Sequence, residues 1–271
     1  MTDVATRIEA GVGWLSLNRP DAANAISGGL ARDLFAALQD LTARDDVRCI
    51  VLRAEGRLFC GGGDLADFAA EGPETMPERI LGVADTLHRS IVLIDRMEKP
   101  LITAIQGTAA GAGVVLAALG DIVLASEQAR FVPAYDRLEL TPDGGSSWVL
   151  PRVMGERAAM AFLLLGAPMS AQEAVASGLV TRTVPHAALA GETARIAETL
   201  ARGSGWAAGQ TRRLIRAGRD APLPDHLDHE GASVSQAIAR PEARAAIAAF
   251  LDKVRDPAPR SGGIGHENSS Q

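Results

Sequence analysis

The sequence predicts an α/β protein with a sheet-containing body and a helical C-terminal region. Short apolar runs typical of buried strands alternate with helical segments in the first half, whereas the composition is helical from Ser146 onward. A sheet-rich part followed by helices indicates this class. With 271 residues the chain can bury a sizeable core. We place the core at residues 1–198, the helical region at 199–255 and a disordered tail rich in Gly, Ser and Pro at 256–271.

The first elements are expected to be a β-hairpin, a helix and a strand. Residues 4–8 and 12–17 alternate apolar and polar side chains around a short turn, as hairpins do. Ser27 can cap a helix whose leucines fall on one face. These leucines are Leu30, Leu34, Leu38 and Leu41. The apolar run 49–54 predicts the next strand.

The middle of the chain is expected to alternate loops, helices and strands. Residues 66–77 contain a glycine and two prolines, which indicates a loop or broken helix, plausibly a flap over a site. Residues 80–97 form an apolar helical stripe that Lys99-Pro100 ends. Strands are expected at 101–105, 122–125, 130–133 and 179–184, and helices at 113–119, 146–153, 156–165, 170–177, 187–202, 206–217 and 225–255.

Two of these strands lead into turns made of small residues. The first turn is Phe59-Cys60-Gly61-Gly62-Gly63-Asp64-Leu65, and the second runs from Gly107 to Gly113. Small side chains let a ligand touch the main chain, and N–H groups at a turn or helix start have no partner of their own. Either turn alone could serve only close packing. Together they predict an oxyanion hole, in which two N–H groups point at one oxygen atom.

Several motifs together resemble the crotonase superfamily of enoyl-CoA hydratases and isomerases, over residues 4–255. They are Asn18-Arg19-Pro20 with Asn24-Ala25, the two turns above, Pro142-Asp143-Gly144-Gly145, and Leu150-Pro151-Arg152 through Gly155. The resemblance implies ββα units stacked into a spiral, an acyl-CoA thioester as substrate, and trimers or hexamers of two trimers. It also implies that the N–H groups of Gly63 and Ala112 form the oxyanion hole. No metal and no cofactor other than the substrate's own coenzyme A are expected.

The resemblance also implies a set of residues around the substrate. They are Ala25, Gly61, Asp64, Leu65, Ala66, Gly111, Tyr135, Glu139 and His88, with Phe250 and Lys253 from the C-terminal segment, which in relatives meets the coenzyme A of the same or a neighbouring subunit. We expect Asp64 to fix its turn through hydrogen bonds to the main chain. Helix packing would explain Phe250 equally well.

The chain departs from the hydratases at their two catalytic glutamates, which align with Val115 and Tyr135. Hydration of a double bond needs a base for water and an acid for Cα, so the loss of both argues against an ordinary hydratase. Asp143 lies where several isomerase relatives carry their acidic residue. One carboxylate suffices for a 1,3-proton shift, because the base can return the proton to another carbon. Without the resemblance, Asp143 would be interpreted as a turn residue or helix cap.

We therefore predict a double-bond isomerase that uses Asp143, and three alternatives stay open. In dehalogenases of the superfamily an Asp at this position is a nucleophile, and a His from the helix that contains His88 activates water. Glu139 is either a second acid, which would support hydration, or a surface charge. The protein could also bind acyl-CoA without turnover. Apolar walls around Asp143 are expected from Val115, Leu138, Leu140 and Trp148.

Bulk composition excludes other classes. The net charge of −6 argues against a nucleic-acid surface. Cys49 and Cys60 are the only cysteines and form no CxxC motif, so neither a disulfide framework nor a zinc site is supported and a reducing cytoplasm is expected.

Residues 1–10 lack the apolar core of a signal peptide. The uncharged run 101–120 has the length of a membrane span, but its glycines and strand-like half favour a buried strand, turn and helix.

Overall fold

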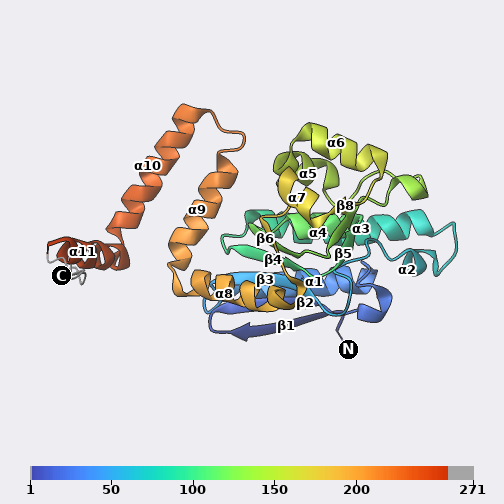
Figure 1. Cartoon of the computed structure of the whole chain (residues 1–271), viewed down its shortest axis with the longest axis horizontal. Coiled ribbons are helices and arrows are strands. Elements are labelled where there is room, and N and C mark those ends of the chain that lie inside the picture. The colour runs from blue at the N-terminus through green and yellow to red at the C-terminus, as the bar shows by residue number, and fades with distance from the viewer. Residues whose placement is uncertain (1, 256–271) are drawn as a thin grey trace, which may run out of the picture. The chain divides into compact units, whose positions relative to one another are not determined.

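Residues 2–255 are described by the computed structural model, except for the side chain of Lys253. The tail predicted at 256–271 therefore lies outside the described residues. The chain divides into two units, the first ending at Arg213 and the second starting at Leu214. The first unit thus continues beyond the core boundary predicted at residue 198, and the division at 198 stays a prediction. The predicted class, an α/β body with a helical C-terminal region, is confirmed (Figure 1).

The body contains two sheets. The six-stranded sheet has the spatial order β1 (Val4–Glu9), β2 (Val12–Leu17), β3 (Cys49–Ala54), β4 (Leu101–Ile105), β6 (Ile122–Ser126) and β9 (Arg182–Val184). The three-stranded sheet has the order β5 (Thr108–Ala110), β7 (Arg130–Val132) and β8 (Met169–Ser170). In the large sheet only the hairpin pair β1 and β2 is antiparallel.

Helices complete the fold. They are α1 (Gly28–Ala43), α2 (Leu65–Ala69), α3 (Met76–Arg96), α4 (Ala112–Ala118), α5 (Ser146–Met154), α6 (Glu156–Leu165), α7 (Ala171–Ser177), α8 (Leu189–Arg202), α9 (Gly205–Ala217), α10 (Leu223–Ala239) and α11 (Pro241–Arg255). Short 3₁₀ segments are η1 (Pro20–Ala22), η2 (Asp136–Leu138) and η3 (His186–Ala188). No described helix is long and apolar enough to cross a membrane. The run 101–120 begins with the strand β4 and ends with the helix α4 as expected, and the turn between them contains the strand β5.

The chain repeats one ββα unit along the body. The unit β4-β5-α4 is followed by β6-β7 and then α5, and each first strand joins the large sheet while each second strand joins the small one. Cys60, after β3, bridges Ala109 of β5 and takes the place of a second strand before α2. Successive units therefore stack side by side, which is the predicted spiral.

Apolar residues alternate between the two faces of the large sheet. On β2, Leu15 and Leu17 face the main core, which also contains the four buried leucines of α1. Val12 faces the other side and packs with Ala197 of α8. The N-terminus of α1 is capped as predicted, because Ser27 Oγ accepts a hydrogen bond from Leu30 N at 3.1 Å.

Several elements differ from the predictions. The strand predicted at 179–184 forms only at Arg182–Val184, and β8 was not predicted. The helix predicted at 225–255 is two helices, because Pro241 forces Arg240 into an extended conformation, with φ −75° and ψ 140°. Helix α3 begins at Met76, four residues before the predicted start at residue 80, because Pro77 lies in the first turn, where its missing N–H is not needed. The turn Gly107–Gly113 contains the three-residue strand β5, which is too short for a periodic signal.

Arg212 of α9 joins the C-terminal end of α3 to Asp121, the residue before β6. Its buried guanidinium pairs with Asp121 at 2.7 Å and also donates to the main-chain oxygens of Ile94, Asp95 and Met97. Arg212→Met should reduce the free energy of unfolding by about 1 to 3 kcal/mol, because it removes one donor of the Asp121 carboxylate, which keeps the N–H of Leu101, and the donor of carbonyls at the end of α3. Chemical denaturation of the variant measures this loss.

Arg213→Met is the matched control, because the neighbouring side chain is exposed and donates only to Gln210 among the contacts described. Its unfolding free energy should stay within about 0.5 kcal/mol of wild type. Equal losses in the two variants would show that the Arg212 contacts do not stabilise the fold.

Candidate active site

The two small-residue turns pack against each other main chain to main chain. Phe59 N donates to Thr108 O at 3.0 Å, and Ala110 N donates to Cys60 O at 2.8 Å, so the first turn runs alongside β5. Gly62 has φ 91°, and a Cβ there would lie 3.0 Å from the main-chain oxygen of Ala110. Only glycine fits this conformation and this approach.

The N–H groups of Gly63 and Ala112 are available to a ligand. Among the described residues neither group donates to a protein acceptor, whereas the N–H of Gly111 is used by Val132 O at 2.9 Å. Ala112 is the first residue of α4, a position whose N–H has no acceptor within the helix. Gly63 and Ala112 line the same cavity, so their N–H groups can serve one acceptor atom.

A cavity of about 260 Å³ opens above these two residues. It is lined by Gly61, Gly62, Gly63, Leu65, Phe68, Ile80, Gly111, Ala112, Ala134, Tyr135, Leu138, Leu140, Thr141 and Asp143. Of the four expected walls, Leu138 and Leu140 line it, but Val115 is fully buried in α4 and Trp148 lines a different cavity. Asp143 is exposed in the single chain, although apolar side chains surround the cavity.

Asp143 lies in a loop that passes close to the start of α4. A Cβ on Gly144, which has φ 56°, would lie 3.0 Å from the Cβ of Ala112. The Tyr135 hydroxyl donates to Asp143 Oδ1 at 3.0 Å and lies 2.9 Å from Ser146 Oγ. Burial, together with the nearby Asp143 charge, raises the pKa of Tyr135 well above its usual value. Tyr135 is thus a protonated donor at neutral pH.

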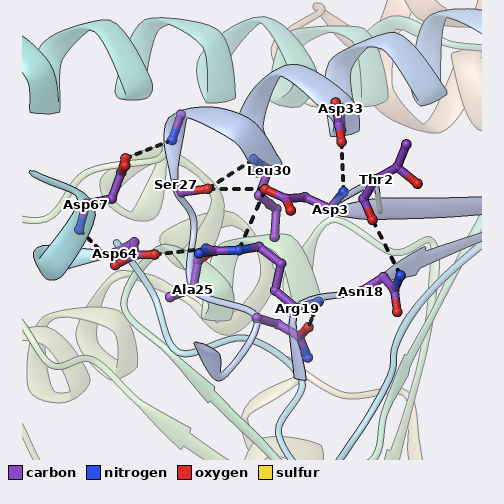
Figure 2. Close-up of polar contacts among 12 residues, drawn as sticks. Thr2, Asp3, Asn18, Arg19, Ala25, Ser27, Leu30, Asp33, Asp64 and Asp67 are labelled. Carbon is purple, nitrogen blue, oxygen red and sulfur yellow. Dashed lines mark hydrogen bonds and ion pairs between the residues drawn. The ribbon is translucent and has the colours of Figure 1, made fainter. Parts of the chain in front are cut away.

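Arg19 connects the first turn to the loop before α1 (Figure 2). Its Nη1 donates to Asp64 Oδ2 at 2.8 Å and to Ala25 O at 2.7 Å. Asp64 Oδ1 accepts from Asp67 N at 3.1 Å and caps α2. The carboxylate of Asp64 therefore fixes the turn that holds Gly63, as expected. Neither Ala25 nor the exposed Ala66 lines the cavity.

His88 and Glu139 lie outside the cavity that contains Asp143. His88 is exposed on α3 and lines a second cavity of about 380 Å³ with Trp148, and the two cavities share no lining residue. Glu139 is exposed, as a surface charge would be. Its backbone is left-handed, with φ 54°. In the second unit Phe250 is 66% exposed, and the side chain of Lys253 lies outside the description.

Some site residues were not predicted. Phe68, Ile80, Ala134 and Thr141 line the cavity, and Ser146 supports Tyr135 from the start of α5. Phe68 belongs to the segment interpreted as a flap, and Ile80 belongs to the helix after it. Their apolar side chains close to the Gly-rich turn were the sequence signal that could have identified them. No sequence pattern indicated the others. The described residues contain no cluster of side chains that could hold a metal ion.

The two thiols are expected to be inert in the folded protein. Burial raises the pKa of Cys49 to about 11 and that of Cys60 to about 12. Since the thiolate is the reactive form, iodoacetamide at pH 8 should label neither residue until the protein is denatured, as mass spectrometry of tryptic peptides can measure. Rapid labelling of Cys60 in folded protein would show that the turn around it opens.

Comparison with known proteins gives one family match, and the similar proteins have related names. The profile of the family Enoyl-CoA hydratase/isomerase matches residues 7–258. The chain is 34% identical over 253 residues to 1,2-epoxyphenylacetyl-CoA isomerase of Escherichia coli, covering 93% of this chain and 97% of the relative. It is 31% identical over 243 residues to 4-chlorobenzoyl coenzyme A dehalogenase-1 of Arthrobacter sp., covering 90% and 88%.

Solved structures agree with these sequence matches. A structure described as a putative enoyl-CoA hydratase/isomerase from Mycobacterium abscessus superposes with a TM-score of 0.85 at 32% identity, covering 92% of this chain and 96% of that chain. A structure described as a putative enoyl-CoA hydratase from Streptomyces coelicolor gives a TM-score of 0.86 at 31% identity, covering 93% and 92%.

Proposed function

This chain belongs to the enoyl-CoA hydratase/isomerase family, and we propose that it moves a double bond within an enoyl-CoA thioester. In this proposal the N–H groups of Gly63 and Ala112 hold the thioester oxygen and stabilise the enolate that forms when a proton leaves Cα. Asp143 takes that proton and returns it to Cγ, so the double bond moves by one position. The reaction needs no metal and no cofactor beyond the substrate's coenzyme A.

The observation that carries this proposal is the set of ionisable groups around the cavity. Among its described lining residues, Asp143 is the one carboxylate and Tyr135 the one phenol. A 1,3-proton shift needs one proton carrier, whereas hydration in relatives uses two carboxylates. The position that aligns with the hydratases' first glutamate holds Val115, which is buried out of the cavity. This arrangement supports isomerisation over hydration.

A hydrolytic dehalogenase is the second candidate function. The sequence similarity to 4-chlorobenzoyl coenzyme A dehalogenase-1 supports it. In that reaction Asp143 would attack an aryl carbon, and a base would activate water to release the product. His88, the candidate base, lines a different cavity from Asp143. The two cavities border the same loop, because Gly145 lines the cavity of His88, so the substrate panel decides between the two candidates.

The test is a substrate panel with the purified wild-type protein. Calorimetry with acetyl-CoA and longer acyl-CoAs first measures binding, and failure of the folded protein to bind any of them would remove the acyl-CoA assignment. Turnover is then measured with a 3-enoyl-CoA, a 2-enoyl-CoA and a chloroaryl-CoA. We expect conversion of 3-enoyl-CoA to 2-enoyl-CoA. Net hydration or chloride release without isomerisation would contradict the proposal, and binding without any turnover would indicate an acyl-CoA-binding protein.

We also propose that the protein assembles into trimers, or hexamers of two trimers. The second unit presents a row of exposed apolar side chains that a neighbouring subunit could cover. They are Ile215, Leu223, Leu227, Val234, Ile238, Ile247, Phe250, Leu251 and Val254. Light scattering at micromolar concentration is expected to give the mass of three or six chains of 28.2 kDa, and a monomer would contradict the proposal.

A further inference from the structure

Two hydroxyl groups contact the Asp143 loop on one side. The Tyr135 hydroxyl lies 3.0 Å from Asp143 Oδ1, and the Ser146 hydroxyl donates to the main-chain oxygen of Asp143 at 2.8 Å. Tyr135 is 8% exposed and Ser146 is 1% exposed. Among the described residues Asp143 Oδ2 has no hydrogen-bond partner. One carboxylate oxygen is therefore held by the protein, and the other is open.

The protons of these hydroxyls can be counted. Each hydroxyl carries one proton and can also accept. The Ser146 proton is used on the Asp143 main-chain oxygen, so Ser146 Oγ can only accept from Tyr135, 2.9 Å away. The Tyr135 proton thus has two near acceptors, Asp143 Oδ1 at 3.0 Å and Ser146 Oγ at 2.9 Å, and a more distant one, the main-chain oxygen of Asp143 at 3.4 Å. A negative carboxylate attracts this proton more strongly than a neutral hydroxyl does.

We propose that Tyr135 and Ser146 are positioning residues for Asp143. Tyr135 holds Oδ1 and so leaves Oδ2 as the oxygen that takes the substrate's proton. While Asp143 is ionised, Tyr135 donates to Oδ1. Once Oδ2 carries the proton, Oδ1 is a weaker acceptor, and the Tyr135 proton turns to Ser146. The Tyr135 hydroxyl therefore has an acceptor in both protonation states of Asp143. A residue that alternately takes and gives a proton needs such an arrangement. This inference rests on the proposed function of Asp143.

The surrounding main chain holds the two hydroxyls in place. The main-chain oxygen of Tyr135 accepts from Leu138 N at 3.0 Å and from Leu140 N at 3.1 Å, which closes the η2 turn. Ser146 N donates to the Asp143 oxygen at 3.0 Å at the start of α5. The raised pKa of Tyr135 keeps its proton in place across the working pH range. The network therefore combines main-chain hydrogen bonds with a donor that keeps its proton.

The two hydroxyls are tested by Tyr135→Phe and Ser146→Ala. Steady-state turnover of 3-enoyl-CoA is measured from pH 5 to 9, and calorimetry measures binding of a saturated acyl-CoA that cannot isomerise. Tyr135→Phe removes the donor to the ionised carboxylate and should lower kcat about 10- to 100-fold, with KM and the acyl-CoA Kd changed by less than about 3-fold. The acid limb of its pH–kcat profile should move to higher pH.

Ser146→Ala removes the nearer alternative acceptor, so Oδ1 at 3.0 Å becomes the nearest acceptor of the Tyr135 proton, ahead of the main-chain oxygen of Asp143 at 3.4 Å. This change favours the ionised carboxylate, so the acid limb should move to lower pH, with a loss in kcat of about 3- to 10-fold. The matched control is Ser126→Ala, which removes another fully buried hydroxyl, one that contacts His186 and accepts from Gln128 N. Its profile should match wild type.

If the acid limbs of the two pH–kcat profiles move in opposite directions, the positioning roles are supported, because a general loss of packing would move both limbs in the same direction. Movement in one direction, or no change in kcat, would overturn the inference. A wild-type protein without isomerase activity would refute the proposed function instead. The inference is then decided by the carboxyl ¹³C NMR titration of Asp143, assigned with Asp143→Asn, whose midpoint must move in opposite directions in the two variants. If Tyr135→Phe does not fold, Ser146→Ala decides alone by the direction of its movement.

Discussion

Asp143→Asn is expected to lower the isomerisation of 3-enoyl-CoA by about 10²- to 10⁴-fold, the range found when a general acid–base is removed. The amide keeps the shape of the side chain, but it can neither take the proton from Cα nor carry it to Cγ. Binding of acyl-CoA should be little changed, because the main-chain donors at Gly63 and Ala112 remain. Initial rates by absorbance and dissociation constants by calorimetry separate the two effects.

His88→Gln and Glu139→Gln are the controls for this variant. Both side chains are exposed and lie outside the cavity of Asp143, so isomerisation should proceed at the wild-type rate. Undiminished isomerisation in Asp143→Asn would rule out the assigned proton carrier. Loss of chloroaryl-CoA turnover in both Asp143→Asn and His88→Gln, with solvent oxygen passing through the aspartate, would instead identify Asp143 as a nucleophile. Hydration that depends on Glu139 would identify a hydratase.

Much of the fold follows from local signals in the sequence. The leucines of α1 repeat at the spacing of one helix face, and Ser27 caps that helix, so both its existence and its start were predictable. The central strands β3, β4 and β6 of the large sheet are apolar runs bounded by turns. Segments without such signals were predicted less well. β5 has only three residues and forms because Cys60 and β7 flank it.

The candidate site was predictable in its main-chain part and less so in its side chains. Glycine at residues 62 and 111 indicates backbone that must approach closely, and the resemblance assigned the donors at Gly63 and Ala112. The contact between Tyr135 and Asp143 depends on η2 and on the left-handed Glu139 that ends it, which turn the chain back on itself. The residue types in this segment do not by themselves predict that the chain folds back in this way. Which cavity His88 lines likewise depends on how α3 packs against the loop before α5.

Ala112→Pro is expected to lower kcat by about 10²- to 10³-fold, because it deletes one of the two N–H groups that hold the enolate oxygen. Position 112 suits this substitution, since it is the first residue of α4, where proline fits the helix and no hydrogen bond within the helix is lost. The thioester carbonyl is less charged than the enolate, so substrate binding should weaken far less than turnover. Steady-state kinetics and calorimetry with a saturated acyl-CoA measure the two effects.

The matched control is Ala112→Gly, which also changes the packing at this 4% exposed position but keeps the N–H group. If the N–H group is the cause, the glycine variant retains most of its activity while the proline variant loses it, at similar thermal stability. Equal activity of the two folded variants would show that Ala112 is not an oxyanion donor. Gly63 would then be the one remaining donor, and a cavity with one carboxylate and one N–H group could not stabilise the enolate to the extent that the proposed reaction requires.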